Sequence, residues 1–223
     1  MKGAIAVFVK TPGLSRIKTR LAAGIGSARA EEFHLISAFA VCAVAKRATA
    51  SLGASVFFAV AESAGMDSPH WQGTDRIFQG VGGLGARMRK VYSNLMENHG
   101  YAILLGADSP QMETGDLESA ASWLLDGVEA RLAYAPAADG GFWLFGGNRS
   151  LPEHLWTSVE YGRPDTGERF KSLMEAHGKL TTMRTLIDAD RPEDLSALLS
   201  GLRRLSSPLP EQTQVVRILE DLP

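Results

Sequence analysis

The chain has 223 residues, of which 45% are hydrophobic and 22% are charged. This length can bury one sizeable core and leaves little room for two independent ones, so we expect a single domain. The formal net charge of −2 gives no global electrostatic reason to bind nucleic acid, and the single cysteine, Cys42, excludes a disulfide framework and a thiolate metal cluster.

The chain begins with an unbroken apolar run at 3–9, which predicts a strand that is covered on both faces. This run is too short to span a membrane, and the polar turn after it does not resemble a signal-peptide cleavage site. We therefore expect no membrane span and a cytoplasmic location. Apolar residues at helical spacing predict a helix at about 27–52. Periodicity and turn residues then predict strands at about 55–60, 75–79, 101–105, 130–135, 142–145 and 180–186, and helices at about 86–97, 115–125, 166–177 and from 191 onward.

This alternation of strands and helices predicts an α/β fold with a mostly parallel, Rossmann-like sheet and helices on both faces. The segment 206–210, Ser-Ser-Pro-Leu-Pro, has the composition of a linker. We therefore expect one domain at 1–205 and a docked C-terminal appendage at 206–223.

Positive charge is concentrated at the start of the chain. Residues 1–30 hold six Lys or Arg and no Asp or Glu, so the remainder carries −8, since −2 minus 6 is −8. The loop 10–22, after the first strand, combines these exposed cations with glycine, as phosphate recognition requires. A solvated basic face is the alternative, and the Walker A order of residues is absent. We predict that the loop binds a nucleotide through Lys10, Thr11, Pro12, Gly13, Lys18 and Arg20.

An aspartate follows the strand predicted at 101–105. Asp108 precedes Ser-Pro, and ligands of open α/β sheets bind beyond the carboxyl ends of the strands. Mg²⁺ is commonly held by one or two carboxylates together with substrate phosphates. Asp108 is therefore a candidate metal ligand, with Asp188 or Asp190 as the second; a helix cap or Asx-turn at Asp108 is the alternative.

A third candidate place is the segment 135–147, in which Asp139 and Gly140 lie between two predicted strands. Asp-Gly is also a common hairpin turn, so a purely structural role is a strong alternative. The density of small residues around the aspartate nevertheless suits the close approach of a sugar or an acceptor to the backbone.

The segment 80–85, Gly-Val-Gly-Gly-Leu-Gly, fits the dinucleotide-binding pattern. The strand predicted before it is short and polar, whereas a Rossmann first strand is an apolar core element. We therefore prefer a loop in which Gly82 and Gly85 help to place Arg87 near a nucleotide, and an NAD(P)-dependent oxidoreductase is the alternative. The five histidines show no paired metal spacing and are expected to be surface or packing residues: His34, His70, His99, His154 and His177.

Five segments, at 10–22, 79–88, 104–110, 135–147 and 186–195, together resemble the ordered motifs of a poorly characterised bacterial family of GT-A-fold proteins. That family is usually described as glycosyltransferase-like and is similar to 2-phospholactate guanylyltransferase. The resemblance extends to about residue 200 and implies a nucleotide-diphospho-sugar transferase fold, with a nucleotide pocket and a divalent metal. The tail after about residue 205 is not explained by these motifs.

Carried over position by position, the resemblance implies phosphate contacts at Lys18 and Arg20 and a metal-binding aspartate at Asp108. It places Asp139, Gly140 and Gly141 on the acceptor side. Two departures are visible: Phe142 stands where relatives commonly have Tyr, and Asp165 precedes Thr166 where many have Gln.

We therefore expect a metal-dependent transferase that uses a nucleotide-activated donor, either a nucleoside triphosphate or a nucleotide sugar, with Mg²⁺ or Mn²⁺ and an unknown small-molecule acceptor. The expected catalytic residues are Asp108, Lys18 and Asp139. Sugar transfer and nucleotidyl transfer need the same neutralisation of a diphosphate, so both remain open. The competing classes are the NAD(P) enzyme and a nucleotide-binding module without catalysis.

Overall fold

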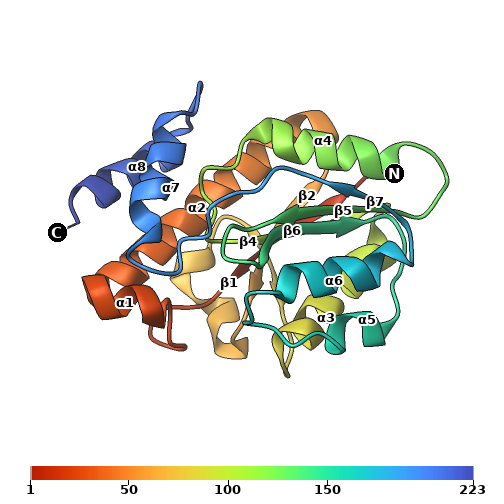
Figure 1. The fold of residues 1–223 in the computed structure, drawn as a ribbon, viewed down its shortest axis with the longest axis horizontal. Helices are drawn as coiled ribbons and strands as arrows, with labels where there is room; N and C mark the ends of the chain where they lie inside the picture. The colour runs from red at the N-terminus through yellow and green to blue at the C-terminus, as the bar shows by residue number, and fades with distance from the viewer. Residues whose placement is uncertain (1, 223) are drawn as a thin grey trace.

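The structure, a computed structural model, describes residues 2–222 and is built around one seven-stranded sheet (Figure 1). The strand order is β3-β2-β1-β4-β6-β5-β7. The strands are β1 (Ala4–Val9), β2 (Ser55–Val60), β3 (Asp75–Phe78), β4 (Ala102–Gly106), β5 (Arg131–Pro136), β6 (Phe142–Gly147) and β7 (Lys179–Thr182). All neighbouring pairs are parallel except those of β6, which is antiparallel to β4 and to β5.

Helices cover both faces of the sheet, as the sequence predicts (Figure 1). The α-helices are α1 (Thr19–Ile25), α2 (Ser27–Leu52), α3 (Leu84–Asn98), α4 (Thr114–Leu125), α5 (Glu153–Thr157), α6 (Thr166–Glu175), α7 (Asp194–Arg203) and α8 (Pro210–Glu220), and two short 3₁₀ turns span Ser63–Asp67 and Pro69–Trp71. Helices α2 and α4 pack on one face, and α3, α5 and α6 pack on the other. The mostly parallel α/β fold is thereby confirmed.

Among residues 2–222, α2 is the one helix whose length and apolar composition would suffice to cross a membrane. In this fold its apolar side chains form part of the core, because α2 packs against β1, β2, α4 and α8. Phe33, Val41 and Val44 are buried along its length, and its many alanines allow the neighbouring elements to approach closely.

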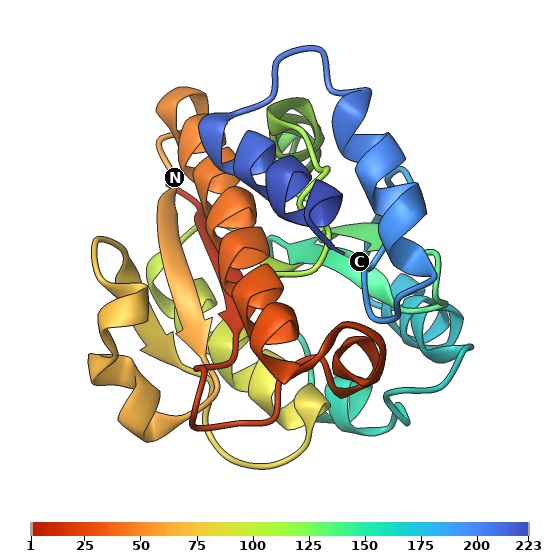
Figure 2. The same cartoon turned by 90° about the vertical axis from the view of Figure 1, so that its left-hand side faces the viewer.

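Helix α8 follows the linker-like segment and lies along α2 (Figure 2). Its side chains Val215 and Leu219 are buried together with Phe33 and with Leu198 of α7. Residues 206–222 thus have a helix that shares a hydrophobic cluster with the rest of the fold. The boundary at residue 205 stays a prediction.

The last strand differs from its predicted span of 180–186. Strand β7 ends at Thr182, and only Leu186 pairs again, through an isolated parallel bridge to Ala137. The chain leaves the sheet at Arg184, whose guanidinium forms two hydrogen bonds of 2.7 Å with Asp116 at the start of α4. An apolar pattern does not reveal that interruption, because it carries no information on such a contact with a distant helix.

Candidate active site

A cavity of about 570 Å³ opens at the carboxyl edge of the sheet. Its wall comes from the ends of β1 and β4, from the first residues of α3, from the β5–β6 turn and from two loops at 161–166 and 188–194. The cavity lining includes Arg20, Asp139, Gly141, Tyr161, Arg163, Asp188, Asp190 and Arg191. This is the edge at which parallel α/β sheets bind their ligands.

Lys18 is not part of the cavity lining, nor is Asp108, but it contacts the 188–194 loop of the cavity wall and has an unusual backbone conformation. With φ of 47° and ψ of 47°, it is the one non-glycine residue with positive φ in the described part of the chain, and it immediately precedes α1. A left-handed conformation costs about 1–2 kcal/mol for a residue with a Cβ. In this conformation the side chain points inward, where Nζ lies 2.7 Å from Asp108 Oδ2 and 2.6 Å from the carbonyl oxygen of Ala189.

The prediction that Lys18 is an exposed loop charge is therefore wrong: its side chain is 5% exposed, whereas that of Arg20 is 57% exposed. Burial acts to lower the pKa of Lys18, but the charges of Asp108, Asp188 and Asp190 outweigh it and raise that pKa above its ordinary value. Lys18 is an internal cation within an acidic cluster.

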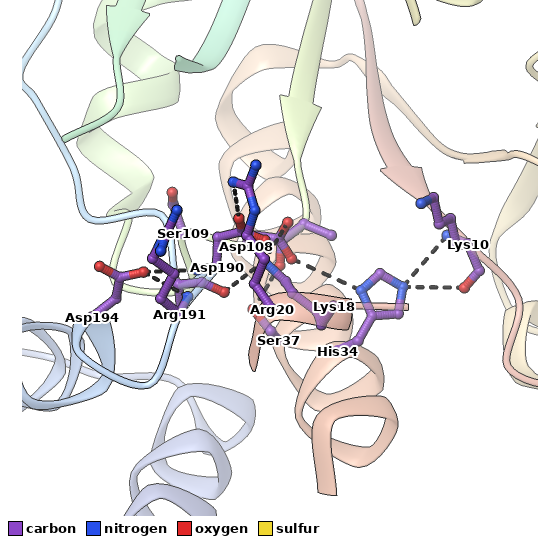
Figure 3. A network of polar contacts seen from close by, with 12 residues as sticks. Lys10, Lys18, Arg20, His34, Ser37, Asp108, Ser109, Asp190, Arg191 and Asp194 are labelled. Atoms are coloured by element: carbon purple, nitrogen blue, oxygen red, sulfur yellow. Dashed lines mark hydrogen bonds and ion pairs between the residues drawn. The ribbon is translucent and has the colours of Figure 1, made fainter. Parts of the chain in front are cut away.

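Asp108 forms the centre of a polar network (Figure 3). Burial acts to raise the pKa of its carboxyl, but Lys18 and His34 outweigh burial and hold that pKa well below its usual range. His34, on α2, has Nδ1 3.8 Å from Asp108 Oδ1 and Nε2 3.1 Å from the carbonyl oxygen of Lys10. The ring thus connects Asp108 to the end of β1.

Sequence reasoning missed His34, which was expected to be a surface or packing residue. It is 5% exposed and belongs to the charged network. Its position three residues before Ser37, which donates a 2.6 Å hydrogen bond to the carbonyl oxygen of Ala107, was the available signal. Two polar side chains on the buried face of an apolar helix indicate a polar partner beneath that helix.

The two aspartates of the 188–194 loop have different environments. Asp190 Oδ2 accepts a 2.9 Å hydrogen bond from Arg20. Asp188 lines the cavity and has no cation within ion-pair distance among residues 2–222. Burial and the nearby charge of Asp108 raise the pKa of Asp188 to about 7.

This pKa gives a prediction for stability. Between about pH 4 and 7 the folded protein holds a proton on Asp188 that the unfolded chain has lost, so the free energy of unfolding should fall as pH rises through this window. Asp188→Asn should remove that fall, which is on the order of 1.4 kcal/mol for each unit of pKa shift. Urea unfolding of both proteins at pH 4 to 8 measures the difference, and parallel pH profiles would contradict it.

The loops that carry the acidic residues are fastened to each other. Ser109 Oγ and Gln111 Nε2 donate hydrogen bonds of 2.9 Å and 2.8 Å to the carbonyl oxygen of Ile187. The N–H of Ala189 in turn donates to the carbonyl oxygen of Asp108. The segments 108–112 and 187–190 are therefore held as one unit.

The candidate donors for a divalent cation are Asp108 and Asp188. The part of the chain that the structure describes contains no group of three or more His, Cys, Asp or Glu side chains that could hold a metal. Of the two predicted second ligands, Asp190 is paired with Arg20, which leaves Asp188 as the carboxyl beside Asp108. The metal site itself stays a prediction. Asp188 is a half-buried carboxyl without a paired cation among residues 2–222, and Asp108 Oδ1 is buried without a hydrogen-bond partner. Two such carboxyls fit a cation whose remaining ligands are nucleotide phosphates and water.

The start of the basic loop serves as support. Thr11 is buried: its N–H donates to Glu62, and its hydroxyl oxygen accepts a 3.0 Å hydrogen bond from Trp71. Lys10 Nζ donates to the carbonyl oxygen of Arg16. Lys10, Thr11, Pro12 and Gly13 do not line the cavity, so the structure separates them from Arg20, which does.

The glycine-rich loop also lies outside the cavity lining at Gly82, Gly85 and Arg87. Arg87 folds back and donates a 2.9 Å hydrogen bond to the carbonyl oxygen of Gly82. The preceding strand, β3, is the partly exposed edge of the sheet. The loop therefore lacks the central apolar strand that a dinucleotide site requires, which removes the structural context of the NAD(P) alternative.

Asp139, Gly140 and Gly141 form the tip of the β5–β6 hairpin. Asp139 Oδ1 accepts a 2.9 Å hydrogen bond from the N–H of Gly141, as in a tight turn. Asp139 and Gly141 also line the cavity, so both the structural and the site interpretation fit this turn. Gly140 has φ of 90°, and an added Cβ would lie 1.8 Å from the carbonyl oxygen of Pro164.

Two cavity residues on the loop between α5 and α6 were not anticipated. Tyr161 donates a 2.8 Å hydrogen bond to the carbonyl oxygen of Trp156, and Arg163 pairs with Glu160 and Asp165. The Gly-Arg-Pro sequence at 162–164 marks a turn but does not reveal which sheet edge the turn approaches. Arg191, which was expected only at the start of a helix, also lines the cavity.

The chain shares its fold with solved structures whose names include nucleotide-diphospho-sugar transferase. It belongs to the family described as "Uncharacterized protein conserved in bacteria (DUF2064)", whose model matches residues 42–163. No curated protein matches the chain.

Solved structures share this fold at low sequence identity. One is a protein from Desulfovibrio desulfuricans G20 named "putative nucleotide-diphospho-sugar transferase", which is 21% identical, with a TM-score of 0.83 and a match covering 99% of this chain and 98% of that one. CMP:2-keto-3-deoxy-manno-octonic acid synthetase complexed with CTP is 14% identical, with a TM-score of 0.55 and coverage of 92% and 100%. A cytidylyltransferase from Leptospira borgpetersenii serovar Hardjo-bovis is 15% identical, with a TM-score of 0.56 and coverage of 99% and 94%.

Proposed function

We propose that this protein is a transferase that takes a nucleotide-activated donor and passes a nucleotidyl or sugar group to a small acceptor in the cavity. The observation that carries the proposal is the Lys18–Asp108 pair, held beside Asp188 where the sheet ends. It combines one cation with two carboxyls, which suits a diphosphate accompanied by a divalent cation. The transferases with the same fold support this class.

Arg20 is the residue best placed for the first phosphate contact. It lines the cavity, and its only ion-pair partner among residues 2–222 is Asp190. This pair is exposed to solvent, with Arg20 Nη1 2.9 Å from Asp190 Oδ2. Exposed pairs are worth little, so an incoming phosphate can replace Asp190 at small cost. Lys18 would supply a second hydrogen-bond donor to the phosphates, and its ammonium is held in place by the carbonyl oxygen of Ala189.

Asp108 and Asp188 would hold Mg²⁺ or Mn²⁺ together with the donor phosphates. When bound, the cation neutralises charge on the departing diphosphate or pyrophosphate. The remaining polar contacts come from the chain itself: Lys18 and Arg20 orient the phosphates, and the 108–112 and 187–190 segments fix the two carboxyls relative to each other.

We assign the acceptor to the part of the cavity that is lined by Asp139, Gly141, Phe142 and Tyr161. Asp139 is exposed, and its carboxylate can accept the proton of an acceptor hydroxyl. Phe142 stacks on Phe170 with ring centroids 4.6 Å apart, so this position serves as apolar support where a tyrosine would offer a hydroxyl.

A thermal-shift panel tests the donor class. Nucleoside triphosphates and nucleotide sugars, each with and without Mg²⁺ or Mn²⁺, should raise the melting temperature only in the presence of metal; a ligand at a hundred times its Kd stabilises by about 2.7 kcal/mol. Released pyrophosphate identifies nucleotidyl transfer, and a released nucleoside diphosphate identifies sugar transfer. A panel without any metal-dependent stabilisation would refute the proposal.

Arg20→Gln should weaken binding of the stabilising nucleotide by about 10- to 100-fold, because a hydrogen bond to a charged group is worth about 1.5–3 kcal/mol. Arg16→Gln is the matched control, since Arg16 lies exposed in the same loop and outside the cavity lining. Calorimetric titration of both variants measures the difference. Equal affinities would remove Arg20 from the phosphate site.

A further inference from the structure

Gln212, on α8, is a buried amide whose hydrogen bonds lead toward the candidate active site. It is 3% exposed. Its Nε2 donates hydrogen bonds of 2.8 Å and 2.9 Å to the carbonyl oxygens of Pro110 and Met112, and its Oε1 accepts one of 2.9 Å from the N–H of Leu209. Both amide protons and the amide oxygen are therefore used.

The two carbonyl groups belong to the turn that directly follows Asp108. This turn is also closed by a hydrogen bond from the N–H of Met112 to the carbonyl oxygen of Ser109. Its other side is fastened to Ile187 by Ser109 and Gln111. The segment that carries Asp108 is consequently held from two directions, by the 187–190 segment and by α8.

Helix α8 has the anchorage that such a support needs. Its residues Val215 and Leu219 are buried against Phe33 and Leu198. Gln212 also satisfies the start of the helix, because its side chain accepts from the N–H of Leu209, the residue before α8. No residue of α8 lines the cavity, and Gln212 is the residue of α8 whose side chain hydrogen-bonds the turn after Asp108.

We propose that α8 is a positioning element of the active site and that Gln212 is its positioning residue, which sets the conformation of the 108–112 turn and thereby the orientation of Asp108. This inference rests on the proposed function, in which Asp108 faces the donor diphosphate. It gives the C-terminal segment a role at the site, in contrast to a docked appendage.

The chemistry of the contact requires an amide. A methionine at position 212 matches glutamine in length but donates no hydrogen bond, so it leaves two buried carbonyl groups without partners. The turn can regain partners only by moving toward water. A movement of the turn changes the direction of the Asp108 carboxylate, which lies two residues before Pro110.

The test compares Gln212→Met with two controls on the same helix. Gln214→Met makes the same substitution at an exposed position, and Val215→Ala weakens the packing of α8 without touching the turn. Circular dichroism melts establish that each variant folds and measure its loss of stability. Gln212→Glu, which keeps an acceptor for the N–H of Leu209, replaces the methionine variant if that variant does not fold.

Two readouts are needed. Amide hydrogen exchange of residues 105–112 reports the turn itself, and electron paramagnetic resonance titration of Mn²⁺ with inorganic pyrophosphate reports the orientation of the site. We expect Gln212→Met to accelerate amide exchange in this segment at least tenfold and to weaken Mn²⁺ binding about tenfold. Both effects should exceed those of Val215→Ala when the two variants are compared under conditions that give them equal stability. Gln214→Met should change neither.

The inference would be overturned if amide exchange and Mn²⁺ affinity changed only in proportion to the loss of stability, and by the same relation in Gln212→Met and Val215→Ala. A wild-type protein that does not bind Mn²⁺ with pyrophosphate would instead count against the proposed function. The exchange measurement remains decisive for positioning in that case, because it needs no ligand.

Discussion

Replacing either Lys18 or Asp108 alone is expected to destabilise the protein far more than replacing both. Lys18→Met leaves the half-buried carboxylate of Asp108 without its ammonium partner, and Asp108→Asn leaves a buried ammonium without its closest carboxylate. Breaking one side of a buried ion pair costs about 3–5 kcal/mol, and we expect the lower part of that range because Asp108 is partly exposed. The double variant should recover much of the loss.

A double-mutant cycle in urea measures this coupling, for which contacting residues typically give about 0.5–3 kcal/mol. The control cycle uses Arg20→Met and Asp190→Asn, since that pair is exposed and should couple by less than about 1 kcal/mol. If the effects of Lys18→Met and Asp108→Asn were simply additive, the ion pair would not be the internal counter-charge described above.

The second large effect is expected at Gly85. An added Cβ would lie 1.9 Å from the carbonyl oxygen of Trp156 and 2.7 Å from the ring of Tyr161. The backbone of α5 must then move, so Gly85→Ala should cost about 3 kcal/mol, which corresponds to roughly 6–12 °C in melting temperature for a chain of this size. Because Trp156 accepts the hydrogen bond of Tyr161, the cavity wall should loosen too.

Gly83→Ala is the matched control for Gly85→Ala. Gly83 is exposed, has φ of −69°, and no heavy atom lies within 4 Å of an added Cβ. It should change stability by less than about 1 kcal/mol. Unchanged melting of Gly85→Ala together with lost nucleotide binding would restore the sequence prediction that this glycine serves the nucleotide.

The inner strands of the sheet were predictable because they are apolar and mostly buried, whereas the edge strands β3 and β7 are partly exposed. The run 3–9 matches β1, which is paired along its whole length with β2 and nearly so with β4. Helices α1 and α5 were not predicted: they have seven and five residues, too few for apolar periodicity to be visible. The Asp139-Gly140 hairpin signal did indicate an antiparallel pair of strands, but the place of β6 between β4 and β5 was not predicted.

The site was predictable in its parts and not in its arrangement. Asp108 follows a buried strand and could be found by that rule alone. The inward direction of Lys18 depends on a left-handed backbone that lysine rarely adopts, and the role of His34 depends on which face of α2 lies against the loop after β4. Both depend on contacts between residues far apart in sequence, and residue types alone do not specify those contacts.

The antiparallel strand β6 has a consequence for how this molecule can diversify. It makes the 137–141 turn a hairpin tip, whose two ends are adjacent, so the tip can change in length without disturbing the parallel strands that carry Lys18 and Asp108 on their loops. Gly140, however, contacts Pro164, and its carbonyl oxygen accepts the N–H of Gly167. The hairpin tip and the loop before α6 must therefore change together. Under the proposed function, in which the tip contacts the acceptor and Lys18 and Asp108 contact the donor, the acceptor side can change while the donor side stays constant.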